Sequence, residues 1–151
     1  MSDHYLILIP EEAGFVPPEA ARAEVLEKFR SIAQTEELSV ELTENVRFEH
    51  CGGYFGKIFC PNCEKEIGLD WWQEQMDEDF GKEKSFKLKA IKLPCCGAVK
   101  TLHELRYESP QGFARFSLSA LEPKVFELSA ETLMGMETVA QCKLRAIYRR
   151  I

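Results

Sequence analysis

The sequence offers no segment that is long and apolar enough to cross a membrane. Spanning a bilayer takes about 18 consecutive apolar residues, and the apolar run Tyr5–Ile9 near the amino terminus is far shorter. That run is also too short for the core of a secretory signal, and Asp3 stands where such a signal carries a basic residue. We therefore predict a cytoplasmic protein with no membrane partner.

The sequence also lacks a phosphate-binding loop, internal repeats and low-complexity tracts. A Walker loop over Gly52–Lys57 would need glycine where Cys51 stands and serine or threonine where Ile58 stands. Nucleotide binding by this route is excluded. We expect the glycines to make a turn or to admit close packing of the backbone.

Length and composition fit one globular domain. A chain of 151 residues, 45% hydrophobic and 29% charged, buries roughly 70% of the surface that its unfolded form exposes. The net charge of −6 is uneven, because residues 1–46 hold ten acids and only three basic residues. Glu64–Asp79 carries seven acids and one lysine, whereas Lys82–Lys100 carries six lysines and one acid. The simplest interpretation of both runs is a solvated surface.

Hydrophobic periodicity predicts a strand, a helix and a strand in the amino-terminal third. The continuous apolar run Tyr5–Ile9, ended by Pro10, is typical of a strand buried on both faces at the centre of a sheet. An amphipathic helix follows the prolines at 17–18 and extends to about Gln34. Alternating apolar and polar residues over 40–50 then predict a second strand.

The carboxyl-terminal third has the same order. Ala114–Ala120 alternates apolar and polar residues, which predicts a half-buried strand with one face toward water. Ser129 is placed to cap a helix, and residues 142–149 return as a strand. Two such halves, residues 1–51 and 111–151, resemble the ferredoxin-like split β-α-β sandwich, an α+β fold in which an antiparallel sheet packs its helices on one face.

The middle segment, residues 52–110, is predicted to be an insertion between these halves within a single domain of residues 1–151. Residues 54–59 and 86–93 are expected to form strands that lead into cysteine clusters. Asp70 followed by Gln73 resembles a capping box for a short helix.

That helix begins with two consecutive tryptophans, Trp71 and Trp72. Two neighbouring helical aromatics cannot both face the same core, so one of them is a candidate for an exposed recognition side chain. The favoured interpretation is that both pack over the cysteines and the sheet.

The two cysteine clusters are the most specific feature of the chain. In Cys60-Pro61-Asn62-Cys63, thiolates three residues apart in a tight turn point both sulfurs at one centre. In Pro94-Cys95-Cys96-Gly97 the cysteines are adjacent, so both face one ion only if the backbone bends, which proline and glycine favour. Over residues 54–99 this pattern resembles a zinc ribbon. The resemblance implies a structural Zn²⁺ held by Cys60, Cys63, Cys95 and Cys96.

Two alternatives to this ligand set stay open at the level of sequence. A regular zinc ribbon repeats the two-residue gap, so His103, or else His50 or Cys51, is a candidate to replace one of the adjacent cysteines. The first cluster also fits a thiol-redox pair, but acidic residues directly downstream disfavour a thiolate there.

Four thiolates leave no open coordination position, which favours a structural site over a catalytic one. We therefore expect a non-enzymatic protein-interaction or regulatory module whose partner is another protein. A nucleic-acid-binding protein is the first alternative, supported by the lysine run but opposed by the net acidity. A thiol-redox or metal-dependent enzyme is the second, and it requires that one cysteine is not a ligand.

Overall fold

The computed structural model describes residues 2–125 and 127–151, and Met1 and Phe126 lie outside the described residues. A four-stranded antiparallel sheet in the order β2-β8-β1-β9 forms the centre of the fold. Its inner strands are β1 (His4–Pro10) and β8 (Gly112–Leu121), and its edge strands are β2 (Leu38–Glu49) and β9 (Leu144–Arg150). The predicted central position of the first strand is confirmed. Its side chains from Leu6 to Ile9 are almost fully buried.

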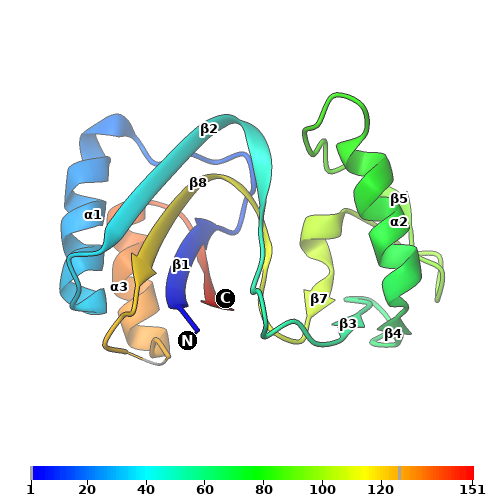
Figure 1. The fold of residues 1–151 in the computed structure, drawn as a ribbon. Helices are drawn as coiled ribbons and strands as arrows, with labels where there is room; N and C mark the ends of the chain where they lie inside the picture. Colours follow the sequence, from blue (N-terminus) through cyan, green and yellow to red (C-terminus); the bar gives the residue numbers. More distant parts are fainter. Residues whose placement is uncertain (1, 126) are drawn as a thin grey trace.

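Two helices, α1 (Glu19–Ala33) and α3 (Ala130–Ala140), cover one face of the sheet (Figure 1). The predicted cap of α3 is present, because the Thr132 N–H donates to Ser129 Oγ at 3.1 Å. Between the helices and the sheet lies the larger core, whose largest buried side chains include Leu6, Leu8, Phe29, Phe116, Leu118 and Met136. Burying each such side chain stabilises the fold by about 1.5–3 kcal/mol.

The opposite face of the sheet is buried as well. Ile7, Ile9 and Ile147 point to this face and are at most 1% exposed. Strand β8, predicted to have one face in water, is buried along nearly its whole length, including Ser117 at 3% exposure. The predicted inward face is confirmed, because Ala114, Phe116, Leu118 and Ala120 are all buried. The other face was wrongly predicted to lie in water, because Arg115 and Ser119 on it are partly buried and Phe113 packs into the core of residues 52–110. Sequence alternation does not reveal this cover.

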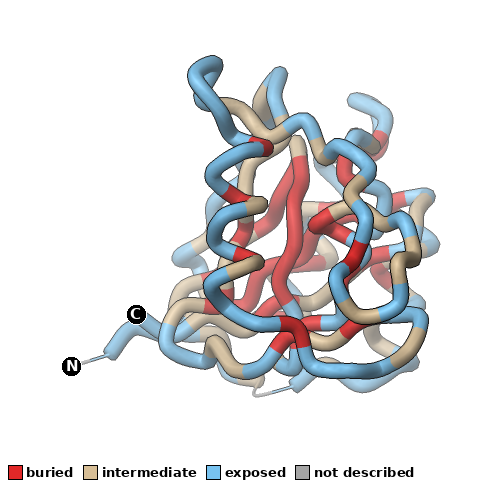
Figure 2. Tube along the Cα trace, turned by 90° about the vertical axis from the view of Figure 1, so that its right-hand side faces the viewer, coloured by how far each residue is buried: buried red, intermediate tan, exposed pale blue. Residues whose placement is uncertain are grey.

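We call residues 52–110 the cysteine module. It contains β3 (Ile58–Phe59), β4 (Glu66–Ile67), α2 (Leu69–Phe80), β5 (Ile91–Lys92), β6 (Val99–Lys100), the short 3₁₀ helix η1 (Leu102–Glu104) and β7 (Arg106–Tyr107). Strands β4, β3 and β7 form one small sheet, and β5 and β6 form a hairpin. The module lies on the side of the sheet opposite α1 and α3. Seen from its own side, the module has exposed outer turns in front of buried segments (Figure 2).

The strands of the module are shorter than predicted. Of residues 54–59 only the last two form a strand, because the N–H groups of Tyr54 and Phe55 donate back in turns to Cys51 and Gly52. Gly52 has a φ of 61°, and a side chain there would collide with the Arg150 carbonyl oxygen. The prediction that these glycines admit close backbone packing is therefore confirmed.

Helix α2 starts without the predicted capping box. Its N-cap is Gly68 with no side-chain cap, and the Gln73 side chain donates to Asp77 at 3.2 Å instead. Trp72 is 7% exposed, and its Nε1 donates to Tyr107 Oη at 3.1 Å. Trp71 is partly buried against the same core. Both tryptophans thus pack inside the module, as the favoured interpretation held.

The loop after α2 is fixed by one buried carboxylate. Asp79 is 6% exposed and accepts backbone N–H groups from Lys87, Leu88 and Lys89, each at 2.9 Å. Leu88 has a φ of 52°, in the left-handed region. These three hydrogen bonds hold the loop against the helix in a conformation that it would not favour alone. Among the described residues, no helix has the length and apolar character needed to cross a bilayer.

Candidate metal centre

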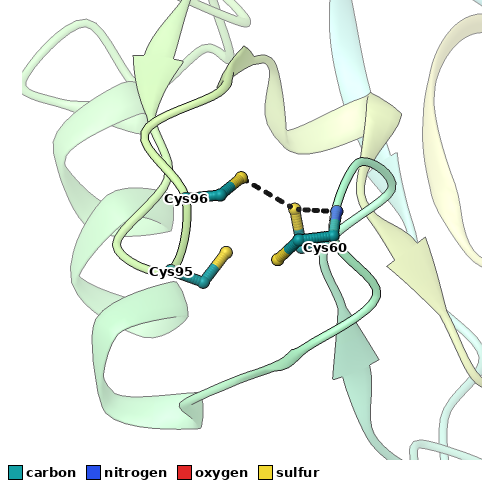
Figure 3. Close-up of side chains that lie close together, drawn as sticks. Cys60, Cys95 and Cys96 are labelled. Carbon is teal, nitrogen blue, oxygen red and sulfur yellow. Dashed lines mark hydrogen bonds between the residues drawn. The ribbon is translucent and has the colours of Figure 1, made fainter.

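The cysteines of the two clusters lie on two hairpin turns. Cys60 and Cys63 belong to the turn between β3 and β4, and Cys95 and Cys96 belong to the turn between β5 and β6. Figure 3 shows the side chains of Cys60, Cys95 and Cys96 directed toward one another.

The four sulfur atoms are close enough to share one metal ion. All four Sγ atoms lie within 4.8 Å of one another, and those of Cys60 and Cys96 are 3.7 Å apart. Four sulfurs in a tetrahedron with metal–sulfur bonds of about 2.3 Å lie about 3.8 Å apart. All six cysteines are free of disulfides. The structure therefore brings together the four cysteines that the sequence analysis proposed as ligands.

The two turns have the same hydrogen-bond pattern. In the first, the Cys60 N–H donates to the Lys65 carbonyl at 2.8 Å, and the Glu64 N–H donates to the Cys60 carbonyl at 3.0 Å. In the second, the Leu93 N–H donates to the Ala98 carbonyl at 2.9 Å, and the Gly97 N–H donates to the Leu93 carbonyl at 3.1 Å. The residues that close the turns, Glu64 and Gly97, have φ angles of 67° and 77°.

This correspondence explains how adjacent cysteines face one centre. Cys96 takes the position that Cys63 has in the first turn, and Cys95 takes the position of Asn62. Leu93, which is 2% exposed, stands where the first turn has Cys60. The first turn therefore has a cysteine at its start, whereas the second turn has the corresponding sulfur in its middle. The required bend is present, because Pro94, Cys95 and Cys96 form the turn itself.

Hydrogen bonds to sulfur favour thiolates at two of the four positions. Burial opposes ionisation of Cys60, but N–H groups of Cys63 and Asn62 donate to its Sγ at 3.4 and 3.3 Å and bring its pKa down to about 6. A hydrogen bond from the Asn62 side chain lowers the pKa of Cys96 most, and a hydrogen bond from the Ala98 N–H lowers it further. Burial, followed by hydrogen bonds with the other three sulfurs, raises the pKa of Cys95 to about 12. A metal ion that binds here displaces the protons of its thiol ligands.

Asn62 was missed by the sequence analysis. Its Nδ2 donates to Cys96 Sγ at 3.4 Å, and its backbone N–H donates to Cys60 Sγ. It therefore contacts one sulfur from each turn and orients both. A side-chain amide between two ligands of a tight turn is the signal that points to such a role.

The centre is enclosed on one side and open on the other. Cys60 is fully buried, Cys63 and Cys95 are partly buried, and Cys96 is exposed. The buried side belongs to the core of the module, which contains Ile58, Ile67, Trp72, Leu93, Leu102 and Tyr107. An ion held by the four sulfurs would therefore join two hairpins to one apolar core, with Cys96 on its exposed side.

The alternative ligands are engaged elsewhere. His103 Nε2 lies 2.6 Å from the Glu11 carbonyl oxygen, and its Nδ1 accepts the Phe113 N–H at 2.9 Å. His50 Nδ1 accepts the Gly52 N–H at 3.0 Å. Cys51 is buried, and its Sγ lies 3.3 Å from Gln111 Oε1. The structure does not bring these three side chains into the sulfur cluster.

Burial of the His103 ring makes the folded protein sensitive to acid. Burial, and then the charge of Arg145, lower the pKa of His103 below 6.5, so the unfolded chain takes up a proton before the folded one. The stabilisation is present above pH 6.5 and is lost as the pH falls below that value. Relative to His103→Gln, we expect the wild type to lose up to about 1.4 kcal/mol of unfolding free energy per pH unit.

Denaturant unfolding of both proteins between about pH 8 and pH 5 tests this expectation. Both proteins contain the same four cysteines, so any effect of acid on the metal centre cancels when the unfolding free energy of one protein is subtracted from that of the other. A difference that does not change with pH would show that His103 does not titrate differently in the two states.

Comparison of the chain with protein-family models, with curated proteins and with solved structures found no match in any of the three. Its function is therefore inferred from the centre and the fold themselves.

Proposed function

We propose that Cys60, Cys63, Cys95 and Cys96 hold one structural zinc ion. The observation that carries this proposal is the convergence of four sulfurs, from two turns of the same conformation, within 4.8 Å. Sulfur ligands in a tetrahedron are typical of zinc, which accepts this geometry without a redox change. Four thiolates fill the coordination sphere, so the ion serves stability rather than catalysis. Cysteines that are not joined in disulfides are typical of a reducing compartment, which fits a cytoplasmic location.

The zinc ion is needed because the cysteine module has little regular structure of its own. Its strands are two residues long, and α2, with 12 residues, is its longest element. Segments this short gain little from backbone hydrogen bonds alone, so the free energy of metal binding becomes free energy of folding. The ion ties the β3–β4 hairpin to the β5–β6 hairpin, which are separated in sequence by α2.

We further propose that the protein is a non-enzymatic interaction module with a ferredoxin-like scaffold. The strand order β2-β8-β1-β9, with α1 and α3 on one face, supports that scaffold, and the module of residues 52–110 fits an insertion between its two β-α-β halves. A rigid scaffold with a metal-held insertion offers a preformed surface to a partner.

The partner is a protein rather than a nucleic acid. The exposed face of α2 carries Asp70, Glu74, Asp77 and Glu78, and the helix contains no basic residue. These acids lie on the same module as the lysines of 82–100 and oppose binding to phosphate. A mixed DNA and RNA sample should therefore give no salt-dependent shift.

Metal content tests the zinc proposal directly. Protein purified without added metal or chelator should contain one zinc ion per chain, and chelation of the zinc should make the thiols of Cys60, Cys63, Cys95 and Cys96 reactive, whereas the buried Cys51 should react only after denaturation. Chelation should also expose the module to proteolysis. Protein with no metal, and with Cys60 and Cys63 oxidised to a disulfide, would overturn the zinc site and favour the thiol-redox alternative.

A further inference from the structure

Strand β2 has an open outer edge. The sheet ends at β2, and within the described residues no strand pairs with its outer side along Leu38–Leu42. The Leu121 N–H donates to the Glu37 carbonyl at 2.9 Å. Because hydrogen-bonded pairs alternate along antiparallel strands, residues 37, 39 and 41 face β8. The N–H and C=O groups of Val40 and Leu42 therefore point away from the sheet.

This edge lacks two of the features with which proteins usually block strand addition, and Glu41 is its one charged side chain. Residues 38–42 contain no lysine and no proline, and the side chains of Val40 and Leu42 are each 44% exposed. An exposed apolar edge strand is a template for pairing with another chain. The register of β2 becomes irregular only after Leu42.

A pocket begins where the open edge ends. It has a volume of about 460 Å³ and lies between residues 43–48 of β2 and the loop that follows α2. Its apolar lining is Val46, Phe48, Phe80 and Phe86. Val46 and Phe86 form an isolated antiparallel bridge, so the module occupies the continuation of the edge. A strand added along residues 38–42 would run up to this pocket.

The acidic residues along the edge favour a basic partner. Residues 36–44 contain Glu36, Glu37, Glu41 and Glu44, all exposed, and no basic residue. Arg30 lies 3.2 Å from Glu36, and Arg47 lies 3.0 Å from Glu41. Glu37 and Glu44 form no ion pair among the described residues, and a two-fold pairing of β2 with a second copy would bring them near acids of the other strand, which is unfavourable. A basic strand is complementary to them.

We propose that the outer edge of β2 binds an extended basic segment of a partner protein, with one bulky apolar side chain seated in the pocket beside Phe80. Main-chain hydrogen bonds to Val40 and Leu42 supply affinity, and the pocket and the glutamates supply specificity. This inference rests on the proposed function, because it names the surface and the partner of the interaction module.

Selection from a random peptide library displayed on phage, against the zinc-loaded full chain, tests this site. We expect enrichment of peptides with lysine or arginine at alternating positions and one aromatic or aliphatic side chain. Affinity should fall about tenfold or more in Val40→Pro, which removes an outward N–H that β8 does not use, and in Phe80→Ser. Val40→Thr, which keeps the N–H, and Met134→Ser, an exposed apolar residue on α3, are the matched controls and should bind as the wild type does.

Hydrogen exchange on the wild type gives a readout that needs no variant. The outward amides of Val40 and Leu42 should exchange fast in the free protein and slowly with an enriched peptide bound. Peptides that bind Val40→Pro and Phe80→Ser as tightly as the wild type, or that protect no amide in β2, would overturn the edge site while leaving the interaction module in place. Absence of any enriched peptide would also overturn the edge site, and metal content would still decide the zinc proposal separately. Concentration-dependent dimerisation that Val40→Pro abolishes would assign the edge to a second copy and overturn the partner proposed here.

Discussion

Replacing Cys60 by serine is expected to abolish binding of the proposed zinc ion and to disorder residues 52–110. Cys60 is the most buried of the four cysteines, and its Sγ accepts two backbone N–H groups that prepare it as a thiolate. Loss of outer hydrogen bonds at metal sites typically weakens affinity about 10- to 100-fold. Loss of a ligand should weaken zinc binding by more than about 100-fold and leave the module open.

The matched control for this variant is Cys142→Ser. Cys142 is also a free, partly buried cysteine, but it packs against the helix-side core, outside the sulfur cluster. Metal analysis and limited proteolysis of both variants should show zinc loss and cleavage within the module for Cys60→Ser alone. Retention of one tightly bound zinc ion by Cys60→Ser would remove Cys60 from the ligand set.

The second large effect is expected on the free energy of unfolding when Asp79 is replaced. Asp79 belongs to the cysteine module but is distant in sequence from the four cysteines. In Asp79→Ala, the N–H groups of Lys87, Leu88 and Lys89 lose a charged acceptor that three hydrogen bonds now share. Hydrogen bonds to a charged group contribute about 1.5–3 kcal/mol each, and their effects overlap within one cluster. We expect a loss of about 3–5 kcal/mol in the free energy of unfolding.

Asp77→Ala is the control for that loss. Asp77 is an exposed carboxylate on the same helix, and among the described residues its carboxylate accepts one hydrogen bond, from Gln73. Denaturant unfolding should place Asp77→Ala within about 0.5 kcal/mol of the wild type. Equal effects of the two substitutions would mean that the loop after α2 does not depend on the buried carboxylate.

Loosening that loop would also disturb the pocket at Phe80 and Phe86, so Asp79→Ala should bind the enriched peptides more weakly.

Local patterns in the sequence were enough to predict several elements. The apolar run at residues 5–9 indicated a central strand, and 3.6-residue periodicity indicated the helices that became α1 and α3. These predictions succeeded because each depends on burial of one segment, which its own side chains encode. The capping box at Asp70 failed because a local pattern is only one of several ways to begin a helix, and here Gly68 precedes α2 without a side-chain cap.

The sequence by itself determined the chemistry of the centre: four thiols in two tight clusters, in a chain with no other comparable group. Only the tertiary structure decided that the adjacent Cys95 and Cys96 face one point, because the match between the two turns depends on backbone hydrogen bonds and not on cysteine spacing. Burial of β8 on both faces and the open edge of β2 were likewise decided by how segments distant in sequence pack together. Alternation along one strand records which side chains are apolar. Which face is covered, and which edge stays free, depends on the neighbours that the strand acquires when the chain folds.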